Sequence, residues 1–134
     1  MNMRLLHRFD RLERVLCQSL AVRNYWTTYS AVTQFGGQIR VRADLIDGGL
    51  LEVFEHITVN PDDTLRLNKY RYHWQDAAGN LVRRWDTAAH HLHLPNAPHH
   101  VHLADGDIEG ITKPPDIAAV IAQIEAYFST GGLT

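Results

Sequence analysis

The sequence has little of several features that would each indicate a particular class of protein. It contains one cysteine, Cys17, which excludes an intramolecular disulfide and a zinc cluster built on cysteines. No apolar run approaches the length of a transmembrane helix, and the N-terminal segment carries too many charges for a secretory signal. The formal net charge is only −2, so any phosphate-binding surface has to be a local basic patch. We therefore expect a cytoplasmic protein without a membrane partner.

The sequence does have the composition of one folded domain, together with an excess of histidine. Hydrophobic residues make up 45% and charged residues 21% of the 134 residues, which is typical of a globular chain. We expect a single domain over residues 1–134. Histidine occurs nine times, and six of these residues lie between His90 and His102. Imidazole titrates near neutral pH and binds metals, so this segment is the candidate functional region.

Apolar residues at helical spacing predict a helix at each end of the chain. The first, over about 3–21, has the stripe Leu5, Phe9, Leu12, Leu16 and Leu20. Cys17 falls on its apolar side and is expected to be buried and unreactive. The second, over about 115–129, has the stripe Ile117, Val120, Ile121, Ile124 and Phe128. It follows the helix-start pattern Pro114-Pro115-Asp116 and ends at Gly131-Gly132.

The segment between the helices predicts an antiparallel sheet. Residues at about 22–86 contain alternating apolar and polar positions, with Ile39, Val41, Ala43 and Leu45 on one face. Turns such as Asp47-Gly48-Gly49 separate the runs, and such short links exclude parallel crossovers. The predicted fold is therefore α+β: a meander of about five strands with both helices packed on one face. Residues at about 87–113 are expected to form a histidine-rich loop.

Residues around this loop resemble a known family. They occur in the order Tyr70-x-Tyr72-His73-Trp74-Gln75-Asp76, Gly79, Arg84-Trp85-Asp86, His90-His91 and Pro98-His99-His100-x-His102, with Leu51, Glu52 and Glu55 upstream. This order resembles the signature of the TumE-like toxins of bacterial toxin–antitoxin pairs. The resemblance implies a type II toxin whose partner is an antitoxin encoded nearby, itself a candidate DNA-binding protein. Thr87 and Ala89 stand where the family form usually has Asn and Pro, which implies a weaker activity if that Asn has a role.

The first hypothesis for the histidines is acid–base cleavage of RNA without a metal. One imidazole would accept a proton and another would donate one, while a cation stabilises the phosphate. The candidate catalytic residues are Asp86, His90, His91, His100, His102 and Arg84. The candidate RNA-binding residues are Lys69, Arg71, Tyr72, Trp74 and Arg83. Tyr70, Tyr72 and Trp74 share a strand face, and a packed aromatic cluster is an equal interpretation of them.

Two other hypotheses remain open. The second is a centre for a divalent transition metal such as zinc, with Asp86, His90, His100 and His102 as candidate ligands. The third is a non-enzymatic surface on which the histidines contact the antitoxin. In all three, an extended segment after Pro98 would turn His100 and His102 to one side and His99 to the other.

Three residues outside the loop have simpler expectations. Glu55 alternates with apolar neighbours, so it is expected to pair with an arginine on an adjacent strand, Arg84 being the first candidate. His56 and His73 are expected to be ordinary strand histidines with satisfied hydrogen bonds.

Overall fold

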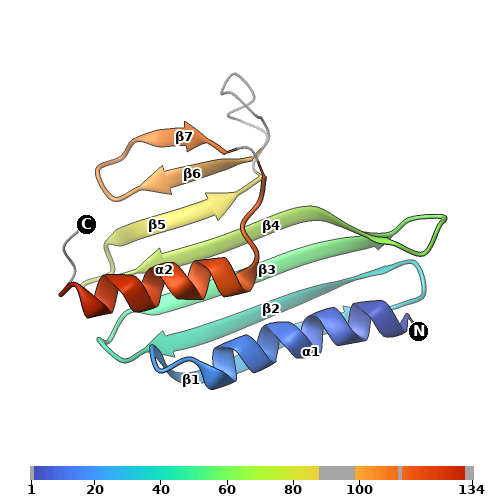
Figure 1. The fold of residues 1–134 in the computed structure, drawn as a ribbon, viewed down its shortest axis with the longest axis horizontal. Coiled ribbons are helices and arrows are strands. Elements are labelled where there is room, and N and C mark those ends of the chain that lie inside the picture. Colours follow the sequence, from blue (N-terminus) through green and yellow to red (C-terminus); the bar gives the residue numbers. More distant parts are fainter. Residues whose placement is uncertain (1, 88–98, 112, 132–134) are drawn as a thin grey trace.

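The chain folds into two helices and one antiparallel sheet. The computed structural model describes residues 2–87, 99–111 and 113–131. Its elements are α1 (Met3–Gln18), β1 (Val22–Val32), β2 (Gly36–Leu45), β3 (Leu50–Val59), β4 (Leu65–Gln75), β5 (Leu81–Asp86), β6 (His100–Leu103), β7 (Ile108–Gly110) and α2 (Ile117–Ser129). The strands lie in the sheet in sequence order, β1 to β7, and both helices cover the same face (Figure 1). The predicted α+β architecture is therefore confirmed.

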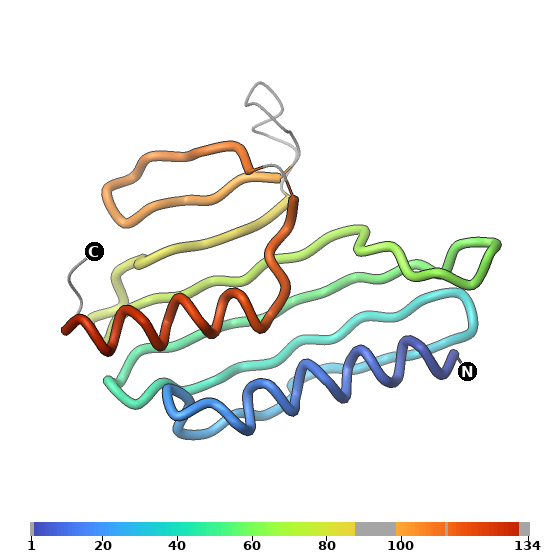
Figure 2. Tube along the Cα trace, in the orientation of Figure 1, coloured from blue at the N-terminus to red at the C-terminus, as the bar shows by residue number. Residues whose placement is uncertain are grey.

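The sheet has seven strands in the described part of the chain, where the sequence predicted about five. The two additional strands, β6 and β7, lie inside the segment predicted as a loop. They contain only four and three residues, which is too short for an alternating pattern to be recognised. They form a hairpin that extends the sheet beyond β5 at the edge opposite β1 (Figure 2).

Helix α1 begins at an Asn2 cap, whose side-chain oxygen accepts a hydrogen bond from the Leu5 amide at 3.1 Å. It ends at Gln18, earlier than predicted, because the Ser19 hydroxyl accepts the Ala21 amide and starts the turn into β1. Leu20 consequently leaves the apolar stripe and is 88% exposed. Cys17 is also exposed, so the prediction of a buried thiol was wrong.

Helix α2 begins after Asp116, whose carboxylate accepts the Ala119 amide at 2.9 Å. Its apolar stripe is buried against the sheet, and Tyr127 meets the Trp74 ring edge-on at 5.0 Å. No helix in the described residues is long and apolar enough to span a bilayer.

The two faces of the sheet differ because side chains alternate along each strand. On the helix-covered face, Val53, Tyr72, Trp85 and Val101 occupy successive paired positions from β3 to β6 and belong to one core. The predicted inward phase of Ile39, Val41, Ala43 and Leu45 on β2 is confirmed, since none is more than 2% exposed. The opposite face, which we call the open face, carries the intervening side chains. The candidate site lies there.

Candidate functional site

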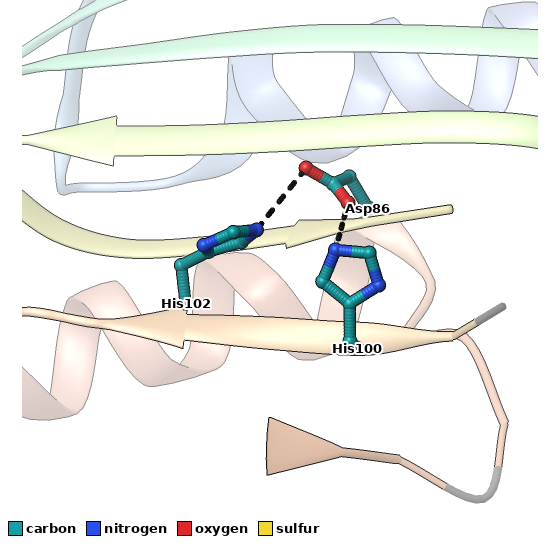
Figure 3. Close-up of side chains that lie close together, drawn as sticks. All are labelled: Asp86, His100 and His102. Atoms are coloured by element: carbon teal, nitrogen blue, oxygen red, sulfur yellow. Dashed lines mark ion pairs between the residues drawn. The ribbon is translucent and has the colours of Figure 1, made fainter. Parts of the chain in front are cut away.

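Strands β5 and β6 bring an aspartate and two histidines together. In their register, Asp86 is opposite His100 and Arg84 is opposite His102. Asp86, His100 and His102 project from the open face, away from both helices (Figure 3). Arg84 projects from the same face, because paired residues of neighbouring strands share a face of the sheet. The predicted phase, with His100 and His102 on one side, is confirmed.

The three side chains of this cluster converge on one small volume. The Nε2 atom of His100 lies 2.5 Å from Oδ1 of Asp86, and the Nε2 atom of His102 lies 3.6 Å from Oδ2 (Figure 3). One potential ligand atom from each residue lies within 4.8 Å of the other two. Asp86, His100 and His102 are 4%, 1% and 8% exposed. A bare imidazole lone pair would repel a carboxylate at 2.5 Å, so the contact needs a shared proton; a metal ion bound by both atoms would hold them farther apart.

Positive charge lies directly beside this cluster. The Nε atom of Arg84 is 3.2 Å from Oδ2 of Asp86, and about a third of the Arg84 side chain is exposed. Arg71 on β4 is opposite Asp86 in the β4–β5 register and is exposed. Both guanidinium groups are therefore placed to meet an anion that approaches the open face.

His99 faces the helix-covered side, as its phase predicted, and packs there against a tyrosine. Its Nδ1 atom lies 3.2 Å from the Tyr70 hydroxyl, and the two rings stack at 5.8 Å. Burial lowers the pKa of His99, and the neighbouring His100 lowers it further. Burial raises the pKa of Tyr70, and the charge of Asp86 adds to this. Both groups are therefore held neutral near pH 7.

A second buried carboxylate, Glu55, belongs to a different network. It is 1% exposed, and it accepts a hydrogen bond from Nε of Arg8 at 2.8 Å and one from the Tyr72 hydroxyl at 2.5 Å. Burial lowers the pKa of Arg8, but the hydrogen bond and charge of Glu55 outweigh this and raise it. The predicted pairing of Glu55 with Arg84 was wrong, because Glu55 faces the helices and Arg84 the open face.

The predicted basic residues divide between the two faces. Lys69 and Arg71 are exposed, two positions apart on β4, on the open face. Arg83 lies on the helix-covered face, where Nη1 donates to Oε1 of Gln123 on α2 at 2.7 Å. It therefore does not extend the patch formed by Lys69, Arg71 and Arg84.

The remaining candidates are placed as follows. Tyr72 and Trp74 are 0% and 3% exposed, so they form the packed aromatic cluster and leave no free ring face for a base. His56 is hydrogen-bonded to Asn68 and His73 to Gln75, as expected. The candidates His90 and His91, and the departure at Ala89, lie outside the described residues.

Thr87, the other departure from the family pattern, follows Asp86 directly. Its hydroxyl accepts the backbone amide of Tyr70 at 3.2 Å and so ties the end of β5 to β4. An asparagine side-chain oxygen could accept the same bond.

Comparison with known protein families places the chain that forms this site in one family. The family model described as Toxin TumE matches residues 5–130. The chain belongs to the TumE toxin family. The match contains the whole Asp86–His100–His102 cluster, and membership of the TumE family indicates an antitoxin partner. No curated protein and no solved structure matches the chain.

Proposed function

We propose that this TumE-family protein is the toxin of a type II pair and cleaves RNA at a metal centre formed by Asp86, His100 and His102. The observation that supports this proposal is the convergence of both Nε2 atoms on one buried carboxylate. Both imidazoles thus direct the same nitrogen inward, as ligands do, and neither Nε2 atom points outward toward a substrate. His90, which the sequence also suggested as a metal ligand, remains a proposed fourth ligand.

The donor set suits a divalent transition metal such as zinc. Two imidazole nitrogens and one carboxylate oxygen are the ligands found in catalytic sites that keep a position open for water or substrate. The strand pairing fixes Asp86 opposite His100, so folding assembles these ligands in advance. A bound metal would polarise a phosphoryl oxygen and lower the pKa of a water molecule.

The neighbouring cations would bind the phosphate. The Nε edge of Arg84 is directed at Asp86, and its other N–H groups remain to bind a phosphate oxygen. Arg71, across from Asp86 on β4, would hold the adjacent part of the backbone. A phosphodiester is the substrate class that this combination of carboxylate, imidazoles and guanidinium groups fits best.

Metal-free acid–base catalysis is the second candidate, and one observation favours it. The 2.5 Å separation of His100 Nε2 from Asp86 Oδ1 also suits a protonated imidazole held by a carboxylate. His100 would then donate a proton to the leaving oxygen, and His102 would accept the proton of the attacking hydroxyl.

The two mechanisms are separated by measuring metal content together with RNA cleavage. We expect about one metal ion per chain by elemental analysis, and cleavage that a chelator abolishes and added metal restores. His100→Ala and His102→Ala should lose both the metal and cleavage. His7→Ala, which removes an exposed histidine on α1, is the matched control and should keep both.

Three results would contradict the proposal in different ways. Metal-free protein that cleaves RNA in the presence of chelator would establish the acid–base mechanism. Full cleavage by His100→Ala and His102→Ala would show that this cluster is not the catalytic site. Metal binding without cleavage of any RNA would leave a metal centre and exclude ribonuclease activity.

A further inference from the structure

The open face carries two rows of side chains that run across the sheet from the cluster toward β1. The strand registers connect the first row in the order His100, Asp86, Arg71, Phe54, Arg40 and Tyr29. They connect the second row in the order His102, Arg84, His73, Glu52, Arg42 and Trp26. The candidate centre is thus one end of a continuous surface.

Beyond the cluster, this surface combines guanidinium groups with accessible aromatic rings. Arg40 Cζ lies 4.2 Å from the centre of the Phe54 ring, and Arg42 Cζ lies 5.8 Å from the Trp26 ring. Trp26 and Tyr29 are 44% and 50% exposed. Exposed aromatic side chains that gather with cations on one sheet surface form the kind of patch that marks a binding site.

The charge of the surface is positive although the whole chain is slightly acidic. Exposed Lys69 and Arg71 on β4 add to Arg40 and Arg42 on β2. Opposing charges on these rows are few: Glu52 lies within the second row, and Asp44 is paired with Arg42 at 3.7 Å. The first row contains no acidic residue between Asp86 and Tyr29. This row is therefore complementary to a polyanion.

We infer that the first row binds single-stranded RNA, which crosses Arg71, Phe54 and Arg40 and presents one phosphodiester at the Asp86 end. The inference rests on the proposed function for the identity of the polyanion as RNA. Aromatic faces and arginine planes bind unpaired bases by stacking, and cations between them bind the phosphates. In a duplex the bases are stacked on each other, so a duplex could interact with the positive charges of the row but not stack on its rings.

The size of the row fits a short stretch of RNA. Neighbouring strands lie about 4.8 Å apart, so the three steps from β2 to β5 span roughly 14 Å. Sheet surfaces of this width in RNA-binding modules stack two or three bases. The row would therefore position a few nucleotides on one side of the bond that is cut, and it would select substrates by single-strandedness more than by sequence.

The test measures binding of a labelled single-stranded 2′-O-methyl RNA by fluorescence anisotropy. Chelator is present so that cleavage does not interfere. Phe54→Leu retains apolar volume but removes the ring, and it should weaken binding roughly tenfold or more. Arg40→Gln should also weaken binding. It should make the dependence of log K on log salt shallower by about 0.7, one phosphate contact.

Controls are matched by chemistry and lie outside the first row. Arg14→Gln removes the same charge from exposed α1, and Phe35→Leu removes an exposed ring from the β1–β2 turn. Both should bind RNA as the unmutated protein does, and the unmutated protein should bind the duplex form of the same RNA more weakly.

Several outcomes would overturn the inference. They are equal binding by Arg40→Gln and Arg14→Gln, duplex bound as tightly as single strand, or a homodimer of the unmutated protein that Phe54→Leu dissociates. If Phe54→Leu no longer co-purified with the co-expressed antitoxin but still bound RNA, the open face would be assigned to the antitoxin instead. RNA bound through this row but never cleaved would leave the inference standing and exclude the proposed function. If Phe54→Leu and Arg40→Gln cleaved RNA as the unmutated protein does, the proposed function would stand and the inferred RNA-binding row would be excluded.

Discussion

The protein contains two buried carboxylates, Asp86 and Glu55, and their partners give them different roles. Glu55 has two directed hydrogen-bond donors, Arg8 and Tyr72, a complete arrangement that joins α1 to the sheet. Asp86 instead faces two imidazoles and a guanidinium group at the end of β5, on the open face. A carboxylate with satisfied donors in the core stabilises the fold, whereas one surrounded by titratable ligands is suited to chemistry.

The same isosteric change at these two residues should separate stability from activity. We expect Asp86→Asn to lower RNA cleavage at least about a hundredfold, and also to lower stability, because Arg84 loses its anion. Glu55→Gln should lower the free energy of unfolding by about 1–3 kcal/mol, because Arg8 loses its anion, while cleavage remains. Thermal or urea unfolding and a cleavage assay on both variants make the comparison. Loss of cleavage in Glu55→Gln that remains fully folded would show that the division of roles is wrong.

At the scale of elements, β4 links the core to the open face. Its inward residues Tyr70, Tyr72 and Trp74 are buried, and its outward residues Lys69 and Arg71 are exposed. Burial raises the pKa of Tyr72 well above 10.0, and the nearby Glu55 charge raises it further. The folded protein therefore strongly favours the neutral phenol.

This shift in the Tyr72 pKa predicts a loss of stability in alkali. Below about pH 10 tyrosine is neutral in both states, so stability does not change. Above that pH the unfolded tyrosine ionises while the folded Tyr72 does not, so the free energy of unfolding falls with rising pH. We expect Tyr72→Phe to flatten this fall in urea titrations across the alkaline range, although the variant itself loses the bond to Glu55. An unchanged alkaline slope in Tyr72→Phe would mean that other groups cause it.

At the scale of the whole molecule, the strand order places the proposed metal centre and the proposed RNA-binding row side by side on one surface. The helices cover one face and complete the core, and the exposed side chains of β1, β2 and β4 that form the rows lie on the other face (Figure 1). The cluster occupies the β5–β6 end and the aromatic–arginine row continues toward β1. In the proposed function, one small domain would bind RNA and cleave it on the same surface.

Family membership and this arrangement together predict growth arrest in bacteria. Expression without the antitoxin should stop growth, and Asp86→Asn should restore it, since the arrest would need the centre. Thr87→Asn, which restores the residue usual in the family, should strengthen the arrest. Growth curves and viable counts at matched protein levels measure these effects. Arrest that persists in Asp86→Asn would point to toxicity through protein binding instead.

Local patterns were enough to predict the helices, the long strands and the phase of the histidines. The apolar stripes of α1 and α2 and the alternation of β2 depend only on the periods of helix and strand, which neighbouring residues set. For the same reason the sequence placed His100 and His102 on one side and His99 on the other. The clustering of His100, His102 and Asp86 was also expected from this phase, once Asp86 ended a strand.

Tertiary structure alone decided which strands and faces meet. Arg8 became the partner of Glu55 because α1 packs on the face that Glu55 occupies, a relation that spans 47 positions of sequence. Which face received Arg83 and which received Arg84 depended on where the helices pack: Arg83 contacts Gln123 on α2, and Arg84 contacts Asp86 on the open face. Leu20 became exposed because α1 ends at Gln18. The open-face rows exist only through the register of five strand pairs. Register depends on turn geometry and on which face of the whole sheet is buried, so the pattern of one strand does not by itself fix its partners across the sheet.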